Sequence, residues 1–137
     1  MSTEDATAPK FRLMHTMLRV LDLDKSIDFY TRHLGMKLLR RFDVEPGRFS
    51  LAFIGYGDED NNTVLELTHN WDQKEPYDLG TAYGHIALAV KDLYGVCDEL
   101  AKAGVSIPRP PGPMKGSNVE LAFIEDPDGY KIELVKK

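Results

Sequence analysis

The chain has 137 residues, 42% of them hydrophobic and 28% charged, a balance that is ordinary for a soluble globular protein. A net charge of −5 without a sizeable basic cluster argues against nucleic-acid binding. The single cysteine, Cys97, excludes an intrachain disulfide and fits a reducing compartment, so we expect a cytoplasmic protein. No apolar run approaches the roughly 20 residues that span a bilayer, so we expect no membrane association.

The first half of the chain has the pattern of one small α+β module. Residues 1–10 are polar and acidic, without the apolar core of a signal peptide, and we interpret them as a flexible N-terminal extension. The module itself spans residues 11–68. Its expected elements are a strand at 13–21, a helix begun by Asp24 and ended by Gly35, and strands at 36–44, 49–54 and 63–68.

The second half repeats this order after a polar linker at 69–82. The second module spans residues 83–137. Its expected elements are a strand at 83–90, a helix begun by Asp92 and ended by Gly104, and strands at 105–107, 119–125 and 130–135. The sequence Asp-Pro-Asp-Gly at 126–129 predicts a tight hairpin between the last two strands.

An internal repeat supports this duplication. The tetrapeptide Leu-Ala-Phe-Ile occupies 51–54 and again 121–124, an offset of 70 positions. His15 and His85 are separated by the same 70 positions, and each lies in an apolar run that opens its module. Self-similarity of this kind fixes an architecture. We therefore expect an α+β fold of two tandem βαβββ modules.

The repeat also predicts a metal site. Each module closes with a glutamate in an apolar strand, and alternation of side chains places each histidine and each glutamate opposite a largely aliphatic face. The four residues are His15, Glu66, His85 and Glu133. Two imidazoles and two carboxylates suit a divalent metal such as nickel, cobalt, manganese or zinc, with water completing the coordination. Any one of the four alone is better explained as a buried, hydrogen-bonded residue, but their matched placement favours a site.

Longer segments carry a family resemblance. These are HTMLRVLDLDKSIDFYTRHLGM, LAFIGYGDED, TVLELTHNWD, YDLGTAYGHIALAV and AFIEDPDGYKIEL. From Leu13 to Val135 the chain resembles glyoxalase I, the lactoylglutathione lyases of the vicinal oxygen chelate superfamily. The resemblance implies curled mixed sheets, a homodimer with active sites at its interface, and metal ligands at the four residues named above.

The resemblance also implies an activity and the residues that perform it. The reaction would be metal-dependent isomerisation of the hemithioacetal of methylglyoxal and glutathione to S-lactoylglutathione through an enediolate, which detoxifies methylglyoxal. Arg19 and Asn70 match positions that bind glutathione, and Lys115, in the segment GPMKG that matches a mobile loop of the family, is a further expected glutathione contact. The proton-transferring base would be Glu133, although strand parity does not separate it from Glu66.

Histidine at position 15 and the short chain resemble the bacterial type that nickel or cobalt activates, because zinc-type members carry glutamine there. Nickel (Ni2+) is therefore the expected metal, with cobalt (Co2+) as the alternative and zinc (Zn2+) as a less active one. Other readings of the same fold are an extradiol dioxygenase, a thiol transferase or a non-enzymatic small-molecule binder. The first two use two histidines and one carboxylate, so the second glutamate disfavours them. The sequence leaves open whether another small thiol replaces glutathione.

Overall fold

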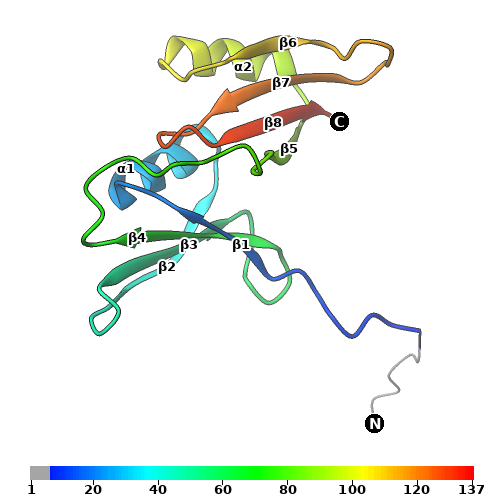
Figure 1. Cartoon of the computed structure of the whole chain (residues 1–137). Coiled ribbons are helices and arrows are strands. Elements are labelled where there is room, and N and C mark those ends of the chain that lie inside the picture. Colours follow the sequence, from blue (N-terminus) through cyan, green and yellow to red (C-terminus); the bar gives the residue numbers. More distant parts are fainter. Residues whose placement is uncertain (1–6) are drawn as a thin grey trace.

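The computed structural model describes residues 7–137 and folds them into two four-stranded mixed sheets (Figure 1). The first sheet has the order β1-β4-β3-β2 and contains β1 (His15–Arg19), β2 (Lys37–Val44), β3 (Phe49–Gly55) and β4 (Val64–Asn70). The second has the order β5-β8-β7-β6 and contains β5 (Ile86–Val90), β6 (Arg109–Pro113), β7 (Glu120–Glu125) and β8 (Lys131–Lys136). In each sheet the first and last strands of the module pair in parallel, and the remaining pairs are antiparallel. The predicted α+β fold of two βαβββ units is confirmed.

The helix of the first module is α1 (Leu23–Asp28), which continues as the π-helical turn η1 (Phe29–His33). The prediction that Asp24 caps this helix was wrong. Asp22 is the N-cap residue instead: its backbone is extended, and its side chain accepts a hydrogen bond from the backbone N–H of Lys25, three residues further on, at 3.1 Å. Asp24 lies in the first turn instead and pairs with Arg41 at 2.6 Å.

The helix of the second module is α2 (Leu93–Lys102). Asp92 caps it as predicted, because its side chain accepts from the backbone N–H of Gly95. Gly104 follows its last turn with a φ of 86°, a left-handed conformation that glycine adopts without strain. Within residues 7–137 no helix combines the length and the apolar character needed to cross a membrane.

The strand expected at 105–107 is absent, and β6 forms further along, in the sequence Arg-Pro-Pro-Gly-Pro. Prolines are tolerated there because β6 lies at the edge of its sheet, where one side of a strand needs no donors. The guanidinium of Arg109 replaces the missing backbone donors by binding the carbonyls of Pro110, Gly112, Pro113 and Leu121. The hydrogen bonds of the Arg109 side chain, and not the strand propensity of the segment, hold β6 in place.

One hydrophobic core joins the two modules. It takes the aliphatic face of each sheet and the inner faces of both helices. The largest fully buried side chains come from both halves of the chain: Val20, Ser26, Tyr30, Ile54, Leu67, Leu93, Ile124, Ile132 and Leu134. The opposite face of each sheet, which we call the open face, therefore remains accessible for polar side chains.

The hairpin between β7 and β8 ties the second module to the first. The hydroxyl of Tyr30 donates to Asp126 at 2.7 Å, and the backbone N–H of Leu21 donates to Asp128 at 2.8 Å. Burial raises the pKa of Asp126, although the hydrogen bonds that it accepts act in the opposite direction. These long-range contacts fix how the two sheets sit within one chain.

Candidate functional site

The first histidine–glutamate pair lies on the open face of the first sheet. Nε2 of His15 is 3.0 Å from Oε1 of Glu66, and the two side chains are 33% and 16% exposed. The hydroxyl of Thr68 donates to the other oxygen of Glu66 at 3.3 Å. Leu65 and Leu67 flank the glutamate in β4 and point into the core, as the alternation predicts.

The second pair repeats this arrangement on the other sheet. Nε2 of His85 is 3.5 Å from Oε1 of Glu133, and the side chains are 41% and 19% exposed. Ile132 and Leu134 flank this glutamate and are buried. His85 lies one residue before β5 begins, so the expected strand starts later than predicted without changing the face that this side chain reaches.

A phenylalanine packs against each pair, and neither was predicted as a site residue from the sequence. Phe53 in β3 is the register partner of Glu66, and Phe123 in β7 stands opposite the second glutamate in the same way. Each phenylalanine ring packs nearly perpendicular to the histidine ring of its own module, with centroids 5.5 Å and 5.0 Å apart. Both phenylalanines are the third residue of the repeated tetrapeptide, so the repeat itself already contained the signal.

The surroundings of the two pairs differ. On the first sheet the guanidinium of Arg40 lies 4.0 Å from the ring centroid of Phe53 and binds both carboxylate oxygens of Glu59. This hydrogen bonding lowers the pKa of Glu59. Beside His85 the second sheet instead has a cavity of about 370 Å³, with Lys131 in its wall. The two equivalent His–Glu pairs therefore lie in chemically different surroundings.

Each pair fits half of the predicted metal site. Cis ligands that lie about 2.1 Å from an ion are separated by roughly 3.0 Å, close to the spacing of His15 and Glu66. Among residues 7–137, however, no three His, Cys, Asp or Glu side chains gather closely enough to hold a metal ion. One chain therefore contains two half-sites and does not bring them together.

Arg19 and Asn70 lie at the far end of the open face from the first pair. Arg19 ends β1 and is exposed, and its register partner in β4 is Thr68, two residues before Asn70. Four residues separate Glu66 from Asn70 along β4, a span of about 13 Å. The side-chain amide of Asn70 donates to the hydroxyl of Tyr77 at 3.0 Å. The structure therefore places these predicted anchors on one face with the first pair.

Tyr130 and Lys115 differ in how they lie relative to the two predicted anchors, Arg19 and Asn70. The hydroxyl of Tyr130, which belongs to the second module, donates to the backbone carbonyl of Arg19 at 2.8 Å. Lys115 is exposed and lies in the loop between β6 and β7. Lys115 therefore lies on a different element from the two predicted anchors on β1 and β4.

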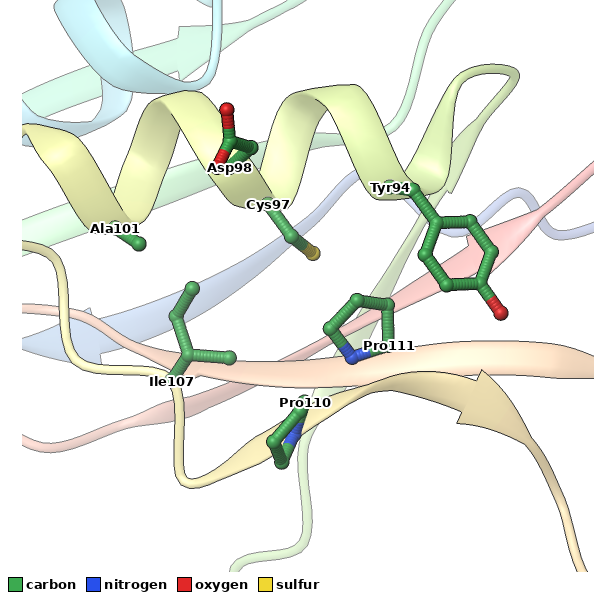
Figure 2. A pocket seen from close by; sticks show the side chains of 7 residues that line it. All are labelled: Tyr94, Cys97, Asp98, Ala101, Ile107, Pro110 and Pro111. Atoms are coloured by element: carbon green, nitrogen blue, oxygen red, sulfur yellow. The ribbon is translucent and has the colours of Figure 1, made fainter.

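A cavity of similar size, about 370 Å³, lies between α2 and β6 (Figure 2). Cys97 points into it from the helix, and burial raises the pKa of this thiol. Its one carboxylate, Asp98, already pairs with Lys102 at 3.0 Å. Because α2 covers the core face of the second sheet, this cavity is separate from the pair on the open face.

Comparison with known proteins assigns the family. Residues 12–134 match the Glyoxalase/Bleomycin resistance protein/Dioxygenase superfamily, and the chain belongs to it. Among curated relatives, a lactoylglutathione lyase of Neisseria meningitidis is 61% identical over 126 residues, which cover 92% of this chain and 91% of that protein. The family resemblance inferred from the sequence is thereby confirmed.

Solved structures of glyoxalase I also resemble this chain. Glyoxalase I from Zea mays has a TM-score of 0.87 and 44% identity over 92% of this chain. The match covers 44% of the maize chain, so the present chain spans less than half of that protein's length. The trypanothione-dependent glyoxalase I of Leishmania major has a TM-score of 0.82 and 46% identity, over 93% of this chain and 87% of that one.

Proposed function

We propose that this chain catalyses the isomerisation of the methylglyoxal–glutathione hemithioacetal to S-lactoylglutathione, and so detoxifies methylglyoxal in the cytoplasm. The observation that carries the proposal is the pair of equivalent His–Glu half-sites on the open faces of the two sheets. The high identity to a protein named lactoylglutathione lyase supports the same activity. A dioxygenase or thiol transferase is disfavoured by the second carboxylate.

The complete site would form in a homodimer. His15 and Glu66 of one chain would meet His85 and Glu133 of the other, because each pair is accessible and supplies half of a four-ligand set. A twofold axis makes such an interface self-complementary, so two identical sites would result. The alternative, a site within one chain, would require the two modules to move against the contacts of their common core.

A divalent metal held by these four side chains, nickel in preference to cobalt or zinc, would stabilise the negative charge that develops on the two adjacent substrate oxygens. The protein's own contribution is the proton transfer. A carboxylate oxygen of Glu133 takes the proton from the carbon that carries sulfur and returns it to the neighbouring carbon, while the hydroxyl proton of the first carbon passes to the oxygen of the second. One carbon is oxidised to the thioester level and its neighbour is reduced to an alcohol, so no external oxidant is needed. Glu66 is the alternative base.

The glutathione part would lie along the first sheet. The guanidinium of Arg19 suits a carboxylate of the tripeptide, and the amide of Asn70 suits its polar backbone groups. The separation of about 13 Å between Glu66 and Asn70 fits a substrate whose sulfur is near the His–Glu pair and whose peptide extends away from it. Lys115 remains a weaker proposed contact, from the loop between β6 and β7.

The test is an assay of the metal-free protein after reconstitution. Nickel-loaded protein mixed with methylglyoxal and glutathione should form S-lactoylglutathione, which is followed by the absorbance of its thioester. Glu133→Gln keeps the size and a metal-binding oxygen but removes the base, so it should bind metal and lose turnover. Absence of thioester formation with nickel, cobalt and zinc alike would refute the proposed function.

A further inference from the structure

The end of β4 carries a hydrogen bond that the proposed reaction does not yet use. Nδ2 of Asn70 donates to the phenolic oxygen of Tyr77 at 3.0 Å, and both residues are half-buried. Within the part of the chain that the structure describes, this is the one side-chain hydrogen bond of the Asn70 amide. Its second N–H and its Oδ1 are therefore left for another molecule.

The segment that follows β4 and leads to Tyr77 begins with a turn at Asn70. The backbone N–H of Gln73 donates to the carbonyl of Asn70 at 3.0 Å, which turns the chain back after β4. The indole N–H of Trp71 donates to Ser50 at 2.9 Å and anchors the start of this segment on β3. The chain thus leaves β4 through a turn held by these contacts, which end four residues before Tyr77.

The hydrogen bond from Asn70 to Tyr77 limits the rotational freedom of the Asn70 side chain. An asparagine side chain on an open face rotates about two bonds, and its nitrogen and oxygen exchange places when the amide turns over. A ligand that binds such a side chain has to order it, and this cost appears in the affinity. A hydrogen bond to the phenol of Tyr77 restricts the rotation of this side chain before the ligand arrives.

We propose that Tyr77 is a positioning residue for glutathione binding, which restricts the rotation of the Asn70 side chain before the tripeptide binds. The inference rests on the proposed function, because Asn70 is a substrate contact only there. Tyr77 does not reach the reacting carbons, since its partner lies about 13 Å from Glu66 along the strand. Its contribution therefore concerns binding and not the proton transfer.

The test compares Tyr77→Phe, Asn70→Ala and the double variant in the nickel-loaded enzyme. Tyr77→Phe should raise KM for the hemithioacetal roughly two- to tenfold, the cost of ordering one side chain, with kcat unchanged. In the Asn70→Ala background the same change should add nothing, because a positioning residue acts only through its partner. The dissociation constant of S-methylglutathione, measured by calorimetry, should change in parallel.

Tyr94→Phe is the matched control. It also removes a tyrosine hydroxyl bonded to a side chain, Glu120 at 2.7 Å, but it lies beside the cavity of Figure 2 and should leave KM unchanged. An unchanged KM in an active Tyr77→Phe enzyme would overturn the inference alone, as would an equal effect of Tyr77→Phe with and without Asn70. A wild type that neither binds S-methylglutathione nor converts the hemithioacetal would overturn the proposed function as well.

Discussion

Mixing two inactive variants tests whether the active sites are shared between chains. His15→Ala damages the half-site of the first module, and Glu133→Ala damages that of the second, so each homodimer should be nearly inactive. In a mixed dimer both lesions fall in one site, and the other site is assembled from the intact halves. Random exchange makes about half of the dimers mixed, and each has one intact site of two, so about a quarter of wild-type activity should return.

The control pairs two lesions in the same module. His15→Ala mixed with Glu66→Ala leaves every shared site with one damaged half, so no activity should return even though the chains exchange equally well. Native mass spectrometry of differently tagged chains measures the exchanged fraction, and the thioester assay measures the recovered sites. If each site were built within one chain, neither mixture would recover. Verified exchange of His15→Ala with Glu133→Ala without recovered activity would refute the shared site.

Three other outcomes are expected. Nickel or cobalt should restore the metal-free enzyme far better than zinc even though zinc binds, since affinity and activation are separate properties, and equal activity with zinc would reject the metal assignment. Arg19→Ala should lower kcat/KM by about one to two decades, the value of a charge-assisted contact of about 1.5–3 kcal/mol, while metal content measured by mass spectrometry stays unchanged. Burial raises the pKa of Asp126, so the stability that this group contributes is present below its unfolded value near 4 and is lost as the pH rises through the folded value. The unfolding free energy of Asp126→Asn, measured in urea, should therefore rise relative to wild type as the pH increases from about 4, and a constant difference would contradict this reasoning.

The hydrophobic periodicity of the sequence predicted the central strands of the sheets better than the edge strand β6. Strands that alternate between a core face and an open face, such as β4 and β8, were predicted within two residues because burial imposes the alternation. The strand β6 was misplaced because its prolines carry no strand signal and the long side chain of Arg109 holds it. The cap of α1 was misplaced because Asp22 and Asp24 are both suitable residues, and only the backbone conformation decides between them.

The candidate ligands could be proposed from the sequence because the duplication repeats a histidine and a glutamate in both halves, the histidines 85 − 15 = 70 positions apart and the glutamates 133 − 66 = 67. The contacts that support them do not follow from spacing in the same way. Phe53 and Phe123 lie in the repeat, but their role depends on strand register, which places each ring across from a glutamate. The contact between Asn70 and Tyr77 depends on the path of an irregular segment, for which neither helical nor strand periodicity gives a rule.

The contacts between modules explain how a duplicated chain can hold two half-sites in a fixed relation. In a shared-site dimer the two half-sites of one chain serve different active sites, so the distance between those sites is set within the chain. The hydroxyl of Tyr130 binds the carbonyl of Arg19, and Tyr130 lies three residues before Glu133. One hydrogen bond thus connects the base strand of one site to the proposed substrate anchor of the other. In such a dimer the hydrogen-bonded hairpin between β7 and β8 would therefore help to set the geometry of both active sites.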